Sequence, residues 1–341
     1  MITFNRSTLQ AAALHYIGND LADEALQLSA ESFVPDPDTE ALLWQHIEKA
    51  FSEPDFQKFT GDSPVWPLAN TFFEKPESAF LETSRHLAET LHRRSQKPSI
   101  KSGELLVLHL RNVVYQEQPT DALVLFKTDV KHPFLFTDLQ EDRLSLHSYR
   151  GISPGKIDKA ALIINCEAGD GYHILAQDQR GSGNVALFWK EEFLGLSPRP
   201  TAYHHTAQFL EATRDFINSN LGDEETELER MDKIALLQKS ADFVEEHDTV
   251  DSQEFGLQVF EDPAVADRFR AYTAQPEAGE EAPQNFDLST EAVKKHRGLF
   301  KSILKLDKNF HVYIHGNRQM IEQGQEADGR KFYKLYYQEE S

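Results

Sequence analysis

The sequence predicts an α+β protein with N-terminal helices packed on an antiparallel β-meander. A helical middle region and a small C-terminal helix-plus-β-hairpin unit follow the meander. Two observations support this class. Short β-rich runs fill residues 104–193, and their connections are too brief for helical crossovers. Helical periodicity precedes them and returns after Pro198-Arg199-Pro200. Consecutive strands joined in this way favour an antiparallel sheet over a parallel Rossmann sheet.

The N-terminal segment contains two clear helical patterns. Residues 38–51 place Leu42, Leu43, Ile47 and Phe51 on one side, and a further helix runs from about Pro76 to Leu91 before Pro98. Residues 7–17 have helix-like apolar spacing, although a strand is not excluded for so short a piece. The prolines and glycines of residues 54–67 predict a loop.

The expected strands are alternating or continuous apolar runs rich in β-branched and aromatic residues. In chain order they are LLVLHLRNVVY, ALVLFKTDV, PFLFTDL, RLSLHSYRG, AALIINCE, YHILAQDQ and VALFWKEEF.

Helices are expected again around 209–217, 228–244, 252–260 and from Pro263 onward. Residues 275–285 have linker composition. Alternation at 310–314, the Gly316-Asn317 pair and Asp328-Gly329 predict a C-terminal hairpin pattern. We therefore expect an α+β domain at 1–198, an acidic helical region at 199–275, a linker at 276–285 and a C-terminal unit at 286–341.

Composition narrows the functional class. The net charge is −21, and no apolar run approaches the ~20 residues of a membrane helix. The N-terminus lacks the layout of a secretory signal, and the one cysteine, Cys166, suits a reducing compartment. We expect a soluble cytoplasmic protein without membrane contact. An acidic chain can bind a polyanion only through local basic patches.

Two such patches stand out. Residues 85–101 hold five bases and one acid, and residues 293–308 hold six bases and one acid. If 293–308 is helical, four of its bases recur at steps of three, four and four and share one face. Neither patch interleaves aromatics, so phosphate contacts with little sequence specificity are expected. The candidate DNA-binding residues are Lys294, Lys295, Arg297, Lys301, Lys305, Arg93, Arg94, Lys97 and Lys101.

Residues 223–262 provide the opposite character, with fourteen acids and three bases. Such a segment suits a basic protein partner. The alternative reading is therefore an acidic protein-interaction module that reaches DNA through another protein.

Motifs for catalysis are weak. Gly151 to Lys156 is one residue short of a phosphate-binding loop, and Gly181-Ser182-Gly183 has no following helix. His204-His205 lacks partner ligands, and Cys166 sits in an apolar run. A third, minor hypothesis is a metal-dependent nuclease that uses Asp121, Asp129 and Lys131 at the ends of one β-run. We expect no catalytic residues, no metal site and no cofactor.

Motifs along nearly the whole chain, in order, resemble the bacterial 37-kDa nucleoid-associated protein family. They include HYIGN at 15–19, FLETS at 80–84, IKSGELL at 100–106, ALVLFKTD at 122–129, KAALI at 159–163, FWKEEFLG at 188–195, LKLDKNF at 304–310 and GRKFY at 329–333. The resemblance implies a non-enzymatic role on nucleoid DNA in the cytoplasm. It leaves open direct contact with double-stranded DNA, recruitment by a DNA-handling partner such as a topoisomerase, and the oligomeric state.

Overall fold

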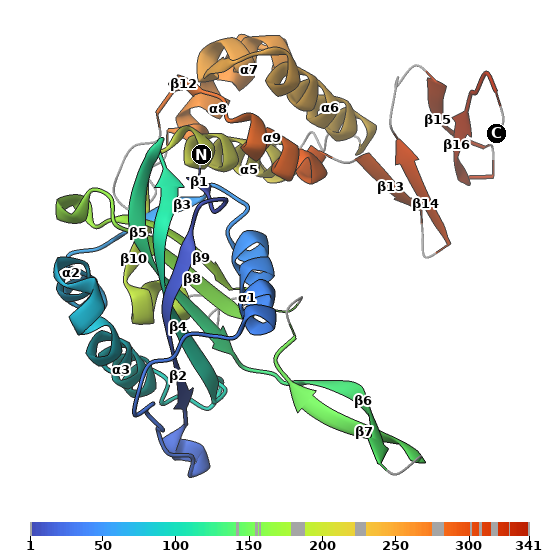
Figure 1. Ribbon diagram of the computed structural model, residues 1–341. Helices are drawn as coiled ribbons and strands as arrows, with labels where there is room; N and C mark the ends of the chain where they lie inside the picture. The colour runs from blue at the N-terminus through green and yellow to red at the C-terminus, as the bar shows by residue number, and fades with distance from the viewer. Residues whose placement is uncertain are drawn as a thin grey trace. The chain divides into compact units, whose positions relative to one another are not determined.

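A computed structural model describes residues 2–140, 143–153, 156, 158–178, 188–221, 230–274, 283–300, 302–306, 309–314, 320–326 and 328–339 (Figure 1). The chain divides into two compact units, Met1–Arg199 and Pro200–Ser341. The expected α+β class is confirmed, since helices and antiparallel sheets are both present.

The first unit is built on an eight-stranded sheet in the described residues, with the order β1-β4-β5-β8-β9-β3-β10 and β2 paired to β4. Every pairing in it is antiparallel. Its strands are β1 (Ile2–Thr3), β2 (Thr8–Ile17), β3 (Phe56–Phe59), β4 (Gly103–Tyr115), β5 (Gln118–Thr128), β8 (Lys159–Ile164), β9 (His173–Asp178) and β10 (Leu196–Pro198).

Alternating side chains cover both faces of this sheet because successive residues of a strand point to opposite sides. Leu123 and Leu125 of β5 pack with α2 (Trp66–Glu74), α3 (Pro76–Arg94) and the π-helical turn η3 (Phe188–Leu194). Val124 and Phe126 face the other way, toward α1 (Pro37–Ala50). Figure 1 shows α1 on one side of the sheet and α2 and α3 on the other.

Three local predictions in this unit were wrong or incomplete. Residues 8–17 form strand β2, because pairing with β4 along its whole length outweighs the helix-like apolar spacing. Residues 54–67, where a loop was expected, contain strand β3 and the start of helix α2, which has Pro67 in its first turn, where proline is tolerated. Residues 188–194 form the η3 turn, which buries Trp189 and Phe193, where a strand was expected.

Two further strands of the first unit, β6 (His132–Gln140) and β7 (Arg143–Gly151), pair only with each other in the described residues. Short 3-10 turns complete the unit at Asp20–Ala22 and Ala168–Asp170.

The second unit has a phenylalanine-rich helical core. Phe209, Phe255 and Phe269 meet edge to face or tilted, with ring centroids 4.9 to 5.7 Å apart. Such aromatic geometry adds to the free energy gained by burial. The helices are α5 (Ala202–Asp215), η4 (Phe216–Asn220), α6 (Arg230–Glu246), α7 (Ser252–Phe260), α8 (Pro263–Thr273), α9 (Thr290–His296) and η5 (Arg297–Phe300).

The short strands of this unit pair as three separate two-stranded sheets among the described residues. They are β11 (Thr249–Asp251) with β12 (Asn285–Asp287), β13 (Ser302–Leu306) with β14 (Phe310–Ile314), and β15 (Ile321–Gln325) with β16 (Lys331–Leu335). The expected turn at Gly316-Asn317 and most of the expected linker at 276–285 lie outside the described residues.

The basic segment 293–308 differs most from its predicted form. Helix α9 ends at His296, η5 follows, and residues 302–306 form a strand paired to β14. Gly298 interrupts the helical pattern, and the alternation of Ile303 to Leu306 suits a strand. Phe300 is buried with Phe209 and Phe255, so residues 286–300 share the helical core and do not begin a separate unit.

Candidate nucleic-acid interface

One end of the first unit's sheet brings together four of the segments that carry the family resemblance, at residues 15–19, 100–106, 122–129 and 159–163. There β2 ends opposite the start of β4, β5 ends opposite the start of β8, and β8 begins opposite the end of β9. At Gly103 the backbones are so close that a Cβ atom would lie 1.9 Å from the Thr128 carbonyl oxygen. Only glycine fits there.

A buried charge cluster fixes this end of the sheet. The Asp129 carboxylate accepts from the Lys127 Nζ at 2.8 Å and from the Lys159 Nζ at 2.5 Å. Both ammonium groups are at most 4% exposed and Asp129 is 10% exposed. Burial lowers the pKa of Lys127, against the opposing effect of Asp129. Burial alone would raise the pKa of Asp129, but the two ammonium groups lower it on balance.

The turn after β5 is held by a second acid. The buried Asp158 carboxylate accepts from the backbone N–H groups of Asp129 and Val130 at 2.7 and 3.1 Å. These bonds orient Asp129 toward the two lysines. The cluster stabilises this end of the sheet and is not an exposed reactive centre, because each charge has an oppositely charged or hydrogen-bonding partner inside the protein.

The loop between α3 and β4 is tied to the same end by Asn19. Its side-chain N–H groups donate to the carbonyls of Ser95, Lys97 and Ile100 at 3.4, 3.0 and 3.0 Å. Its Oδ1 accepts from the Leu21 N–H at 3.0 Å, which caps η1 (Asp20–Ala22). Asn19 is 5% exposed. This side chain therefore sets the path of the loop that bears Lys97 and leads to Lys101.

The predicted cations of this region are exposed, and they differ in their partners. Lys97 is bound to the Glu192 carboxylate of η3, with Nζ to oxygen distances of 2.6 and 2.5 Å. Arg93 donates to the Thr90 hydroxyl at 3.2 Å. No carboxylate within the described part of the chain lies in ion-pair distance of Arg93, Arg94 or Lys101. These three form no ion pair and are the cations left for an external anion, and the Arg94 charge also contributes, after the hydrogen bond from the Thr60 hydroxyl, to lowering the pKa of Asp62.

The second predicted patch is partly neutralised by acids from other elements. Arg297 pairs with Glu245 of α6 at 3.1 Å, and His296 lies 3.8 Å from Glu211 of α5. Hydrogen bonds to its own backbone N–H and to Ser289 lower the pKa of Glu291, and the Lys294 charge adds to this shift. Lys295 is exposed on the same short helix.

The remaining lysines of the second patch do not extend a basic helix face. Lys301 lies outside the described residues, and only the backbone of Lys305 is described, in β13. A helix face running from 294 to 305 therefore does not form, and the predicted single basic stripe was wrong in geometry.

The structure does not bring together the three residues of the nuclease hypothesis. Asp121 stands near the start of β5, bonded to His109 at 3.1 Å, and Asp129 follows the end of that strand. Eight residues of extended chain separate them by roughly 26 Å, far beyond the span of a shared metal ion. Lys131 pairs with Glu104 at 2.5 Å. The three groups are not brought to one site.

One described group has ligand types suited to a transition metal. Atoms of Cys166, Glu167 and His173 lie within 4.8 Å of one another. Arg199 already donates to the Glu167 carboxylate at 3.0 Å, and burial raises the pKa of the Cys166 thiol. A cation beside the carboxylate and a protonated thiol both oppose metal binding. We assign these residues to the ion-pair network of Arg199. Cys166 follows β8 and is half-buried, not a core residue within a strand.

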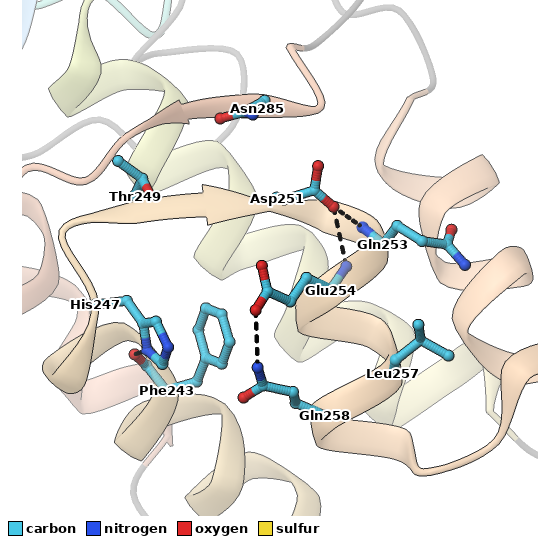
Figure 2. Close-up of a pocket in the computed structure, with 9 residues that line it drawn as sticks. All are labelled: Phe243, His247, Thr249, Asp251, Gln253, Glu254, Leu257, Gln258 and Asn285. Carbon is cyan, nitrogen blue, oxygen red and sulfur yellow. Dashed lines mark hydrogen bonds between the residues drawn. The ribbon is translucent and has the colours of Figure 1, made fainter.

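The acidic helical region contains an open depression of about 650 Å³ (Figure 2). The Phe243 ring stacks on His247 at one wall, with centroids 4.0 Å apart. Opposite them, Asp251 caps α7 by accepting from the N–H groups of Gln253 and Glu254 at 2.9 and 3.0 Å. Gln258 donates to Glu254 at 3.1 Å. Two carboxylates beside a stacked aromatic pair match a basic side chain. Sequence reasoning found the acidity but not this depression, which needs β11 and α7 to meet.

No helix in the described ranges has the length and apolar character to cross a bilayer. No curated protein matches the chain. Residues 14–329 match the family model NA37, described as nucleoid-associated protein YejK. The match spans most of the chain, including the sheet end around Asn19, Gly103 and Asp129. The chain therefore belongs to this family of nucleoid-associated proteins.

Proposed function

We propose that this nucleoid-associated protein is non-enzymatic and binds double-stranded DNA directly, through phosphate contacts with little sequence specificity. The main observation in support of direct binding is that Arg93, Arg94 and Lys101 are exposed and form no ion pair with a carboxylate in the described residues. Arginine and lysine at the end of a fixed helix and its loop are suited to the DNA backbone. No aromatic side chain alternates with them, so base stacking is not part of the proposal.

The remaining predicted cations contribute less. Lys97 would have to leave Glu192, and Arg297 would have to leave Glu245, before either could bind a phosphate. Lys294 and Lys295 are exposed, and Glu291 of the same short helix lowers the local positive potential beside Lys294. The assignment of Lys301 and Lys305 to DNA remains a prediction from the sequence.

Asn19 provides a test of how the loop presents its cations. We expect Asn19→Ala to lower the free energy of unfolding by about 1–3 kcal/mol, because three carbonyls, two of them in buried hydrogen bonds, lose their donor. DNA affinity at low salt should fall by a few-fold, since Lys101 is no longer held in place. Chemical denaturation and a fluorescence anisotropy titration measure both effects. The exposed Gln10→Ala change is the control and should alter neither. Unchanged stability in Asn19→Ala would contradict the role given to this side chain.

The depression in the acidic helical region favours a second candidate function, the binding of a basic protein segment. An arginine side chain placed there would meet the Glu254 and Asp251 carboxylates and the face of the stacked Phe243 and His247 rings. Such a partner would bring the chain to the nucleoid without DNA contact by Arg93, Arg94 or Lys101.

An arginine-rich peptide tests the second candidate without DNA. Isothermal titration should show binding to the wild type and at least about tenfold weaker binding to Glu254→Gln, since a charge-assisted contact is lost. Glu246→Gln removes an exposed acid of α6 outside the depression and serves as the matched control. Equal weakening by both variants would indicate that the peptide is attracted by the overall negative charge of the chain. It would contradict the proposal that the depression binds a basic segment.

A further inference from the structure

The hairpin of β15 and β16 carries the GRKFY motif at 329–333, which the proposed duplex contact does not use. Figure 1 shows the two strands paired near the C-terminus. Backbone hydrogen bonds extend this ladder by one residue at each end. The Tyr336 N–H donates to the Met320 carbonyl at 2.7 Å, and the Glu326 N–H donates to the Arg330 carbonyl at 2.8 Å. The extended strand therefore runs from Arg330 to Tyr336.

One face of this hairpin is covered by the second unit. Ile321 and Tyr333 pack against Ile234 of α6, together with Leu306 of β13 and Val312 of β14. An antiparallel sheet with one packed face ordinarily presents its other face to solvent. The open face is therefore the one available to a ligand.

The open face alternates cations with aromatic rings. Every second residue of a strand points to the same side, so neighbours in this row stand roughly 7 Å apart. The Arg330 and Lys334 side chains are 81% and 55% exposed, and Tyr336 is 53% exposed. We call the row the platform; its members are Arg330, Phe332, Lys334 and Tyr336.

Both rings of the platform are held in place. A Cβ atom at Gly324 would lie 2.3 to 2.9 Å from three atoms of the Phe332 ring, so this ring lies against the glycine backbone. The Lys334 Nζ is 5.2 Å from the centre of the same ring. The Tyr336 hydroxyl donates to the Glu322 carboxylate at 2.5 Å. Rings that are already ordered lose little side-chain entropy when a ligand stacks on them.

We propose that the platform binds an unpaired strand of nucleic acid, with bases stacked on Phe332 and Tyr336 and phosphates at Arg330 and Lys334. Aromatic rings with cations between them bind single strands without reading their sequence. In a duplex each base face is covered by the neighbouring base pairs, so the rings have nothing to stack on. This site is therefore separate from the duplex contact proposed for the first unit.

The cations of the platform are available to phosphates. Arg330 binds Asp328 through its Nε at 2.7 Å, and its Nη1 and Nη2 groups have no partner in the described residues. The Lys334 Nζ lies 3.5 Å from Glu322, whose side chain is 49% exposed. Exposed ion pairs of this kind contribute little stability, so a phosphate can replace the carboxylate.

A basic protein segment is a poorer occupant of the same face. Lys334 already lies beside the Phe332 ring and would repel a second cation. The Glu322 carboxylate is already bound by the Tyr336 hydroxyl, and Asp328 by Arg330. The charge on this face that remains free to attract a ligand is positive at Arg330.

Anisotropy of a labelled oligothymidylate of about 20 nucleotides tests the proposal on the full chain. The wild type should bind it at low salt. The double variant Phe332→Leu/Tyr336→Leu should bind at least about tenfold more weakly, because leucine keeps apolar bulk but offers no ring for stacking. Tyr336→Phe keeps the ring and loses only the hydroxyl, so it should bind as the wild type does. Circular dichroism checks that each variant is folded.

The matched control is Phe310→Leu, at a ring of β14 that is 63% exposed and lies outside the platform. It should leave oligothymidylate binding unchanged. Arg93→Glu/Arg94→Glu/Lys101→Glu should also retain it, whereas the leucine variant should retain duplex binding. Failure of either proposed site is thus seen separately. An oligouridylate of equal length gives the RNA comparison, and the tighter of the two strands identifies the natural ligand.

Glu326→Gln gives a test with opposite signs for the two occupants. Glu326 is exposed and lies on the platform's side of the hairpin, two residues beyond Gly324. Removing its charge should tighten oligothymidylate binding by about twofold to fivefold, because it repels phosphates. Weaker binding in this variant, absence of wild-type binding to both strands, or an unchanged affinity in the leucine variant would each overturn the proposal.

Discussion

Asp129→Asn should lower the free energy of unfolding by about 3–5 kcal/mol, although the side chain keeps its size. The reason is that the Lys127 and Lys159 ammonium groups, at most 4% exposed, would lose the carboxylate between them. Removing one partner of a buried ion pair leaves uncompensated charge, which is costlier than losing an exposed pair. Urea denaturation measures the change. Glu31→Gln, at an exposed acid of the same unit, should alter stability by less than about 0.5 kcal/mol.

Acid titration of stability tests the same cluster. The pKa of Asp129 is lowered in the folded state because the two ammonium groups outweigh the effect of burial. A carboxyl with a lowered folded pKa stabilises the protein fully above its unfolded pKa of about 4. That contribution is lost as the pH falls through the lower folded pKa. The acid-induced loss of stability should therefore be smaller in Asp129→Asn than in the wild type. If the two proteins had identical profiles of stability against pH, and Asp129→Asn left stability unchanged, the stabilising role of this cluster would be contradicted.

Reversing the three cations that form no ion pair should give the largest effect on DNA binding. Arg93→Glu/Arg94→Glu/Lys101→Glu replaces three attractive contacts with repulsive ones. We expect DNA affinity at 50 mM salt to fall by at least about tenfold. Anisotropy of a labelled duplex measures it, with circular dichroism as the check on folding.

The second basic patch supplies a control of equal charge change. Lys294→Glu/Lys295→Glu/Arg297→Glu also replaces three cations with three acids. Its effect should be smaller because Arg297 is paired with Glu245, and Glu291 stands beside Lys294. A larger loss in this variant than in the first would move the interface to the second unit.

The fold was predictable where periodicity and turn chemistry agree. The meander from residue 103 to 178 follows from alternating apolar residues and short connections. Helix α7 follows from Asp251 as its N-cap, and α8 from Asp262 and Pro263. Residues 8–17 were ambiguous because their partner, β4, lies about a hundred residues away in sequence. Local spacing does not contain that pairing.

The candidate site was less predictable because its charges are matched across the fold. The sequence showed a basic segment with one acid nearby, but Glu211 and Glu245 reach it from other helices. Asp121 and Asp129 appeared as a pair, yet the length of β5 separates them. The role of Asn19 depends on three carbonyls some 80 residues further along the chain. Sequence distance carries no information on such contacts.

Direct phosphate contact is the central claim, and the salt dependence of DNA binding tests it most directly. For three phosphate contacts per chain, the slope of log Kobs against log salt concentration should be about −3. A slope of −3 corresponds to roughly a fortyfold to sixtyfold loss of affinity between 50 and 200 mM salt. The slope should approach zero in the Arg93, Arg94 and Lys101 reversal variant. Absence of wild-type binding at 50 mM salt, or a slope that this variant leaves unchanged, would contradict the account.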